Sequence, residues 1–451
     1  MTTTRRSFMA GSAGIGAGLA VLAGSATEAQ AAAKSVLVAS DFGAKPGRSQ
    51  PQTKALQKAI NAAIKQKRSL YLPGGTYFCD TLSIRGLVHL IGVPGQTQIL
   101  AAGGKPLLLV EDTPEVTLEG ITFDGNFASP LGDARGGLVE CRGTRALRIE
   151  RCSFLRSRRS GLSLKGCGGS VTGSSFAENR NAGLFSLDAT GLTITGNLVE
   201  KCENNGILIW QSKKGRDGSI VSHNQIRNIG AKDGGSGQNG NGINIYRAAN
   251  VTASDNMISA CTFSAVRCNS ADNVQITGNN CSDLGEVALY VEFAFQGAVV
   301  SNNVVDTAAI GIAITNLNEG GRLAVCSGNL VRNITRKRFN DGWGVGIGAD
   351  GDTALTGNVV ENAARSGIAL GWGQYLQNTV ATGNMIKDCP IGLEASTTRG
   401  AGQALISNNI ISGAKKGAIL GMHWTKPSTG DLAKPGVAQP DNLTVSGNHA
   451  V

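Results

Sequence analysis

Residues 379–386 read TVATGNMI, and the same arrangement of an alternating apolar segment, a small residue and an asparagine recurs along most of the chain. Successive repeats lie 22 to 40 residues apart, an interval typical of solenoid proteins, in which each repeat forms one coil. The asparagine falls at Asn197, Asn224, Asn256, Asn279, Asn302, Asn329, Asn358, Asn384, Asn408 and Asn448, and Ile121, Cys152 and Ser174 occupy the same frame nearer the N-terminus. This repeat decides the fold.

Each unit carries a second signature, a glycine or alanine followed by alternating apolar residues, as in GILI at 206–209 and GINI at 242–245. Alternation with a period of two over four to six residues indicates short β-strands. A unit therefore holds three brief strands, and stacked units give parallel sheets with strands about 4.8 Å apart. We predict an all-β, right-handed parallel β-helix of three sheets and about 12–14 coils.

The asparagines should lie inside the coil at the turn between the second and third strands. An amide carries both donors and acceptors, so stacked asparagines can bond the turn and one another. Asparagine also tolerates the left-handed backbone conformation that a tight turn requires.

Composition agrees with narrow coils, since the 451 residues include 63 glycines and only 5% aromatic residues. The ten cysteines fall mostly on inward or turn positions, where a thiol acts as a small apolar filler, and the absence of a Cys-x-x-Cys pair argues against zinc. We divide the chain into a signal peptide (1–33), a cap helix with the first coils (34–115), the repeats (116–423), and a C-terminal loop with a last partial coil (424–451).

The N-terminus carries Arg5 and Arg6, then Ser7-Phe8-Met9, a small and weakly apolar stretch, and alanine-rich cleavage sites. This pattern is that of a bacterial twin-arginine export signal, so we expect the export machinery as a partner and a periplasmic or secreted location. No later apolar run is long enough to span a bilayer. A formal charge of +10 favours anionic partners such as uronic-acid polysaccharides, and the compartment disfavours nucleic acid.

Both ends of a solenoid need a cap. Ser49 to Gln52 are predicted to form a capping box, and Leu56, Ile60 and Ile64 the apolar face of a helix that closes the first coil. Residues 425–441 are predicted to form a lid over the last coils or a trimer interface, a monomer being favoured over a trimer.

The chain resembles the pectin-lyase-like superfamily of exported β-helix proteins, and within it most closely the twin-arginine-translocated repeat proteins, whose role is not established. The resemblance rests on Asp41-Phe42-Gly43-Ala44, the helix at 55–60, the segment LPGGTY at 72–77 and the Gly-Ile and Asn coils, so that it covers residues 41–451. It implies a substrate groove along the outer face of the Gly-Ile-x-Ile sheet. The Asp-Asp and Gly-His-Gly motifs of polygalacturonases and the Asp-Pro-His motif of mannuronan epimerases do not occur.

Outward positions on that sheet should align in two columns, because alternate side chains point to opposite faces. The first column is Ser163, Leu208, Asn244, Arg267, Tyr290, Ala313, Gly348, Ala369 and Glu394. The second column is Lys165, Trp210, Tyr246, Asn269, Glu292, Thr315, Asp350, Gly371 and Ser396.

From these columns we predict Arg267, Tyr290, Glu292 and Asp350 as catalytic residues and Trp210, Asn244, Tyr246 and Asn269 as substrate-binding residues. Insertions at 211–218, 230–240 and 336–344 should flank the groove as basic walls. Their predicted substrate-binding residues are Lys213, Lys214, Arg336 and Arg338.

Two reactions fit this set. In a β-elimination, Arg267 would neutralise the uronate carboxylate while Tyr290 or Tyr246 acts as base or acid, for which the tyrosine pKa must fall. In a hydrolysis, Glu292 and Asp350 would act as paired carboxylates two coils apart.

We expect no cofactor and no metal. Calcium on Asp350, Asp352 and Asp341 is the weaker reading of an Asp-Gly-Asp turn. The leading hypothesis is a lyase or hydrolase acting on an acidic polysaccharide, the alternative is a non-catalytic glycan-binding or scaffold protein of the cell envelope, and a structural trimer resembling tailspikes ranks last.

Overall fold

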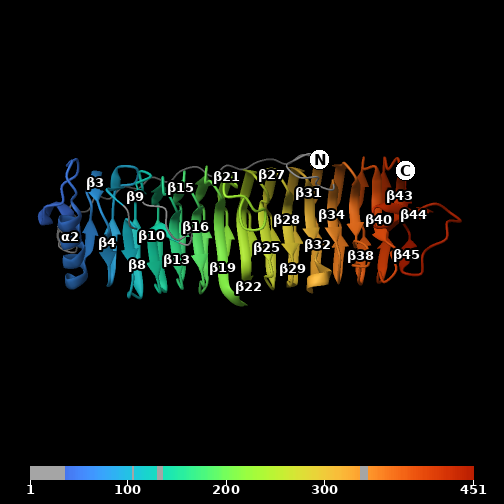
Figure 1. Cartoon of the computed structure of the whole chain (residues 1–451), viewed down its shortest axis with the longest axis horizontal. Coiled ribbons are helices and arrows are strands. Elements are labelled where there is room, and N and C mark those ends of the chain that lie inside the picture. Colours follow the sequence, from blue (N-terminus) through green and yellow to red (C-terminus); the bar gives the residue numbers. More distant parts are fainter. Residues whose placement is uncertain (1–35, 104–105, 129–135, 336–343) are drawn as a thin grey trace, which may run out of the picture.

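The computed structural model describes residues 36–103, 106–128, 136–335 and 344–451, which form a three-sheet parallel β-helix of about 13 coils (Figure 1). Each coil contributes one strand to each sheet, and every pairing between the named strands is parallel except one at the C-terminal end. The predicted three-sheet architecture with a helix at its N-terminal end is confirmed. Among the described residues no helix combines the length and apolarity that crossing a membrane requires.

The first sheet contains the strands that precede the asparagine turn. Its strands, in spatial order, are β1 (Val36–Val38), β2 (Ser69–Tyr71), β5 (Val88–Ile91), β8 (Glu115–Glu119), β11 (Ala146–Glu150), β14 (Gly169–Thr172), β17 (Leu192–Thr195), β20 (Ile220–Ser222), β23 (Thr252–Ser254), β26 (Val274–Thr277), β29 (Gln296–Ser301), β32 (Arg322–Ser327), β35 (Thr353–Thr356), β38 (Thr379–Thr382), β41 (Ala404–Ser407) and β45 (Leu443–Ser446).

The second sheet contains the Gly-Ile-x-Ile strands and carries the candidate site. Its strands are β4 (Leu82–Ile84), β7 (Leu108–Val110), β10 (Gly137–Arg142), β13 (Ser160–Lys165), β16 (Ala182–Leu187), β19 (Asn205–Arg216), β22 (Asn241–Ala249), β25 (Val266–Asn269), β28 (Val287–Glu292), β31 (Ile310–Ile314), β34 (Val345–Ala349), β37 (Ser366–Leu370), β40 (Ile391–Ser396), β43 (Gly417–His423) and β44 (Lys426–Asp431).

The third sheet follows the asparagine turn. Its strands are β3 (Gly75–Cys79), β6 (Thr97–Ala101), β9 (Ile121–Asp124), β12 (Ser153–Leu155), β15 (Ser175–Ala177), β18 (Leu198–Glu200), β21 (Gln225–Ile229), β24 (Met257–Cys261), β27 (Asn280–Leu284), β30 (Val304–Ala308), β33 (Leu330–Ile334), β36 (Val359–Ala363), β39 (Met385–Lys387), β42 (Ile410–Ser412) and β46 (His449–Ala450).

The buried asparagines form one continuous hydrogen-bonded ladder. Each side-chain amide donates to the next asparagine and to a strand carbonyl, as Asn279 Nδ2 does to Asn303 Oδ1 at 3.0 Å and to the Ala253 carbonyl at 3.0 Å. The predicted register is wrong at two coils, because Asn303 and Asn409, rather than Asn302 and Asn408, occupy the ladder.

The left-handed residue in each of these turns is the one before the ladder position, not the ladder asparagine itself. Asn302 and Asn408 both have φ = 56°, and glycine takes the equivalent place at Gly278 and Gly383. The ladder amide can therefore point inward from an ordinary backbone conformation while its neighbour makes the bend.

Helix α2 (Thr53–Gln66) closes the N-terminal end of the core, with Leu56 and Ile60 buried. The predicted capping box is wrong, since Gln52 is the N-cap and makes no side-chain capping bond. Its side-chain oxygen instead accepts a hydrogen bond from the Lys45 amide at 2.7 Å. Two short 3₁₀ helices, η1 (Ala39–Phe42) and η2 (Leu317–Glu319), complete the elements.

At the C-terminal end, β44 pairs antiparallel with β43 and covers the edge of the second sheet. The Asp431 carboxylate accepts hydrogen bonds from the backbone amides of Ala418 and Ile419 at 2.9 and 3.0 Å. Residues 425–441 thus include a strand that forms hydrogen bonds with an otherwise open strand edge. Of the two predicted roles, lid or trimer interface, this arrangement matches the lid.

The ten cysteines are all free and buried, which confirms their prediction as core fillers. Burial raises the pKa of these thiols; that of Cys152, at the ladder position, rises to about 12. They are neutral packing groups in the folded chain.

Candidate functional site

The outer face of the second sheet carries the two predicted columns in the predicted register. Strand pairing places Asn244 beside Arg267 and Arg267 beside Tyr290, and the second column runs in parallel from Trp210 through Tyr246. Val291 pairs with Ile314, and Ile314 pairs with Ala349 on the following strand. Glu292 and Asp350 come directly after Val291 and Ala349, so they lie two coils apart. The sequence missed one coil, β16, which adds Phe185 and Leu187 to the columns.

The prediction that these side chains face open solvent is wrong for Asp350, which is 8% exposed, and for three residues of the middle coils. Asn244, Arg267 and Glu292 are only 2%, 6% and 1% exposed, whereas Tyr290 is half-buried. They point away from the core, as the alternation requires, but they do not reach solvent.

The cause is the insertion at residues 230–240, which folds across the sheet instead of standing beside it. Its Gly237 carbonyl accepts a hydrogen bond from Asn244 Nδ2 at 3.0 Å, and its Ser236 carbonyl accepts one from Arg267 Nη1 at 2.7 Å. The insertion therefore forms a cover over the first column at β22 and β25.

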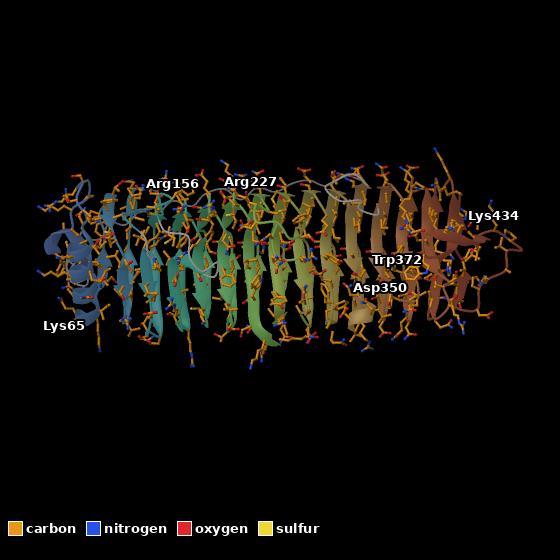
Figure 2. The ribbon with its side chains drawn as sticks, viewed as in Figure 1. Lys65, Arg156, Arg227, Asp350, Trp372 and Lys434 are labelled. Carbon is orange, nitrogen blue, oxygen red and sulfur yellow. The ribbon has the colours of Figure 1, made fainter. Side chains whose placement is uncertain are left out.

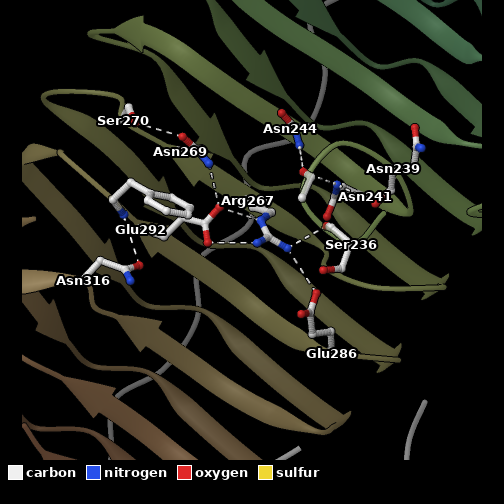
Figure 3. Close-up of polar contacts among 12 residues, drawn as sticks. Ser236, Asn239, Asn241, Asn244, Arg267, Asn269, Ser270, Glu286, Glu292 and Asn316 are labelled. Carbon is white, nitrogen blue, oxygen red and sulfur yellow. Dashed lines mark hydrogen bonds and ion pairs between the residues drawn. The ribbon is translucent and has the colours of Figure 1, made fainter. Parts of the chain in front are cut away.

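Beneath this cover lies a closed ionic cluster, which we call the central network: Ser236, Arg267, Asn269, Glu286 and Glu292 (Figure 3). Arg267 binds Glu292 through two bonds, Nε to Oε1 at 2.8 Å and Nη2 to Oε2 at 2.9 Å. Its Nη1 also reaches Glu286 Oε2 at 3.1 Å. Four donor contacts of the guanidinium are thus made within the protein, and it is not available to neutralise a substrate carboxylate.

Tyr290 lies under the same guanidinium, whose Cζ is 4.8 Å from the ring centroid. Its pKa nevertheless rises to about 12, because burial and the Glu292 carboxylate outweigh the effects of Thr315 and Arg267. The β-elimination hypothesis required a lowered pKa, whereas the surroundings of Tyr290 shift it in the opposite direction.

The second column stays partly open where the first is covered. Trp210, Tyr246, Asn269 and Thr315 are half-buried along it. Phe185, Trp210 and Tyr246 form a row of edge-to-face contacts, with ring centroids 5.5 and 5.6 Å apart. Trp210 Nε1 donates to Asn244 Oδ1 at 3.0 Å, which fixes the indole. The row runs from the buried Phe185 in the first column to the half-buried rings of Trp210 and Tyr246 in the second.

The predicted basic walls differ from expectation. Residues 211–216 continue strand β19 with a shift in register between Trp210 and Gly215, so they are not a loop. Lys213 is exposed, whereas Lys214 pairs with Asp272 at 2.8 Å and donates to the Ala294 carbonyl at 2.6 Å. Arg336 and Arg338 lie outside the described residues.

Further along the same face a hollow of about 360 Å³ surrounds Asp350; we call it the Asp350 hollow. Its other polar and aromatic lining residues are Tyr290, Thr315, Arg365, Trp372, Tyr375 and Glu394. Figure 2 shows Asp350 and Trp372 close together on the outer surface of the later coils. Arg365 pairs with Glu394 at 2.9 Å.

Sequence reasoning missed Arg365, Trp372 and Tyr375 as site residues. Trp372 and Tyr375 lie in a tight turn after β37, closed by two backbone hydrogen bonds between them of 3.1 and 3.0 Å. A Trp-x-x-Tyr segment directly after a Gly-Ile-x-Leu strand was the available signal.

The Asp350 carboxylate accepts a hydrogen bond from the Asn316 backbone amide at 2.8 Å. Burial raises its pKa from the ordinary 3.8 to about 6, against the lowering effect of the Asn316 and Leu317 amides. The Asp352 carboxylate is bound by Arg322 and Asn378, and Asp341 lies outside the described residues. Of the three carboxylates predicted as calcium ligands, Asp352 is thus already bound by a guanidinium and an amide of the protein.

We expect the stability of the protein to fall as pH rises from about 4 to about 6. In that window the folded chain holds a proton on Asp350 that the unfolded chain has released, so ionisation favours unfolding by up to about 3 kcal/mol. Asp350→Asn should abolish this component and leave the rest of the profile. Urea unfolding of the wild type and of Asp350→Asn at pH 4, 5, 6 and 7 measures how the stability of each depends on pH. Parallel profiles for the two proteins would contradict the prediction.

Comparison with known proteins supplies the family. The model of the family described as periplasmic copper-binding protein (NosD) matches residues 131–281 and 263–432, together more than half of the chain. The chain belongs to the NosD family. None of the curated proteins matches this NosD-family sequence.

Solved structures share the fold at low identity. Gene product 12 of bacteriophage phi29 has a TM-score of 0.53 at 14% identity, covering 90% of this chain and 57% of that one. The GH87 α-1,3-glucanase of Streptomyces thermodiastaticus has a TM-score of 0.48 at 14% identity, with coverage of 92% and 68%. The mannuronan C-5 epimerase AlgE4 A-module of Azotobacter vinelandii has a TM-score of 0.47 at 13% identity, with coverage of 91% and 100%. The likeness to gene product 12 shows the fold of this NosD-family chain alone, and none of the three shows its reaction.

The family description raises copper, and the side chains of this NosD-family chain do not fit it. All four histidines and ten cysteines belong to the described residues, where no group of three or more His, Cys, Asp or Glu side chains is placed to hold a metal. Copper sites use imidazole, thiolate or thioether ligands, whereas these thiols are buried and neutral. One histidine, His89, is engaged by Glu119 at 2.9 Å.

Proposed function

We propose that this protein binds a polysaccharide along the second column, from the aromatic row at Phe185, Trp210 and Tyr246 to the Asp350 hollow. The observation that carries the proposal is that the half-buried rings of Trp210 and Tyr246 lie in the same column as Asp350, which lines a concave site on the same face of the solenoid. Five coil steps separate β19 from β34, a span of about 24 Å at ~4.8 Å per step. A ligand that contacts both ends must be a polymer.

The chemistry of the track suits sugar rings. Aromatic faces pack against the C–H side of a pyranose, and the polar edges of Trp and Tyr, with Asn269 and Thr315, can bond its hydroxyls. The central network is a rigid floor under this track and not its reactive centre. The formal charge of +10 supports an acidic polymer as ligand.

The export signal supports a ligand outside the cytoplasm. Arg5 and Arg6 with the small apolar stretch that follows support twin-arginine export. The family description as periplasmic agrees with that compartment. An envelope or extracellular glycan is therefore the ligand class that we propose.

Hydrolysis is a second candidate, favoured by the raised pKa of Asp350. A carboxyl that keeps its proton near pH 6 can protonate a leaving oxygen, and Glu394 lines the same hollow as a second carboxylate. Glu292 does not fill that second role because it lies in the central network and is not among the residues that line the hollow. Asp350→Asn would then remove release of reducing ends while binding persists.

The binding proposal predicts that Trp210→Ala lowers affinity for a bound glycan by about tenfold or more, since it removes the central ring of the row. A glycan array first identifies the ligand, and calorimetry with that ligand measures the loss. Phe127→Ala is the matched control, because Phe127 is an exposed aromatic residue that follows β9 of the third sheet. Equal affinities for both variants would refute the track, as would no glycan binding at all by the wild-type protein.

A further inference from the structure

A second hollow lies on the same face, nearer the N-terminal end, at strands β10, β13 and β16. It encloses about 410 Å³, and its side-chain lining includes Glu140, Arg142, Arg159, Lys165, Phe185 and Leu187; we call it the basic hollow. Only Lys165 of these residues stood in the columns expected from sequence. The hollow is large enough for a sugar ring and much larger than an ion.

Arg159 is the least satisfied cation of the basic hollow. Its side chain is 17% exposed, and its Nε atom is buried without a hydrogen-bond partner. Its ion-pair partner among the described residues is Glu140, whose Oε1 lies 3.8 Å from Nη1, which is too long for a hydrogen bond. A buried guanidinium donor left in this state is stabilised by an acceptor that enters the hollow.

Lys165 adds a second uncompensated charge at the rim. It is exposed, stands in register with Arg142 on the neighbouring strand, and within the described ranges its ammonium group makes no hydrogen bond or ion pair. Arg142, in contrast, is already held by Glu111 and Glu140, each at 2.8 Å.

The described residues of the lining carry three cations and one carboxylate, a formal balance of 3 − 1 = +2. The Asp350 hollow has the opposite balance, one cation (Arg365) and two carboxylates (Asp350 and Glu394), or 1 − 2 = −1. The two ends of the proposed track thus differ in the charge that they accept.

An apolar wall completes the basic hollow. The Phe185 side chain, 2% exposed overall, lines it and also contacts Trp210 edge to face at 5.5 Å between centroids. The aromatic row consequently begins in the hollow. A ring with one apolar side and one oxyanion substituent matches Phe185 on one wall and Arg159 with Lys165 on the other.

We propose that the basic hollow is an anion subsite that binds one sugar unit bearing a carboxylate or a sulfate ester, and that it sets the orientation of an acidic chain along the track. The inference rests on the proposed function, because it assigns one end of that same track. Within it, Arg159 supplies a planar fork to the oxyanion and Lys165 a point charge at the entrance.

The test compares oligogalacturonate with its fully methyl-esterified form, which has the same backbone without the charges. By calorimetry at low salt, the wild-type protein should bind the acidic form about tenfold or more tightly. Lys165→Gln and Arg159→Gln should each remove most of that preference and leave affinity for the esterified form unchanged. Lys434→Gln, at an exposed residue of the C-terminal loop (Figure 2), should behave as wild type.

Each outcome separates the two proposals. If both hollow variants keep the full preference for the acidic form, the subsite is wrong while the track stands. The wild type could instead bind digalacturonate in a Lys165-dependent way and bind oligomers of greater length with only the same affinity. In that case the track is wrong and the subsite stands. Binding of a sulfated neutral oligosaccharide distinguishes a sulfate subsite from a carboxylate subsite. Because Lys165 is exposed, Lys165→Gln still tests the subsite if Arg159→Gln fails to fold.

Discussion

Asn303→Ala should lower the free energy of unfolding by about 3–5 kcal/mol. The Asn303 amide is 1% exposed and donates to the Ile276 carbonyl at 2.9 Å and to Asn329 Oδ1 at 3.0 Å, while its oxygen accepts two bonds from Asn279. Alanine removes the Asn303 partner of the Ile276 carbonyl and of two Asn279 donors, all buried on the preceding coil, and each such group costs about 1–3 kcal/mol. Equilibrium urea unfolding, followed by circular dichroism, measures the loss.

The neighbouring residue provides the control. Asn302 has φ = 56° and an exposed side chain, and glycine holds the same place in most coils. Asn302→Gly should therefore change stability by only a few tenths of a kcal/mol. If the two substitutions cost the same, the ladder does not run through Asn303. Because neighbouring coils can open separately, coincidence of two spectroscopic probes should be checked first.

Arg267→Ala should cost about 3–5 kcal/mol of stability, because it strands the buried Glu292 carboxylate that Arg267 now binds through two hydrogen bonds. A residue that served substrate alone would lose affinity and leave stability unchanged. Thermal unfolding and urea unfolding of the variant discriminate between these roles.

The double variant Arg267→Met with Glu292→Met tests the cause. Replacing both charges with apolar side chains of similar length removes the buried Glu292 carboxylate together with its partner and leaves only Glu286, whose side chain is 25% exposed, so most of the loss should be recovered. A double variant as unstable as the single one would mean that Arg267 acts by holding residues 230–240 over the sheet rather than by neutralising Glu292. Its Nη1 bond to the Ser236 carbonyl makes that the competing explanation.

Much of the coil could be predicted because alternation and turn chemistry are local. Trp210, Tyr246 and Arg267 were assigned to the correct strands and to the outer face from the period of two alone. The predicted ladder is wrong by one residue at Asn302 and Asn408, because each precedes a second asparagine. The sequence does not tell which of two adjacent side-chain amides points inward. The hydrogen bonds of the neighbouring coils decide that.

The candidate site was harder to predict because a period says which face a residue occupies and not what covers that face. Residues 230–240 are rich in glycine and polar groups, and nothing local shows that they fold over Asn244 and Arg267. Trp372 and Tyr375 lie in a turn outside the alternation, so no column included them. Several residues of the candidate site therefore lie in segments that interrupt the repeat.

The ten free thiols have a consequence for biogenesis. They are distributed from Cys79 in β3 to Cys389 near the last coils, and none is joined to another. The fold therefore requires no disulfide, and no oxidant or disulfide isomerase is needed to form it. The same native state is therefore accessible under reducing and oxidising conditions alike.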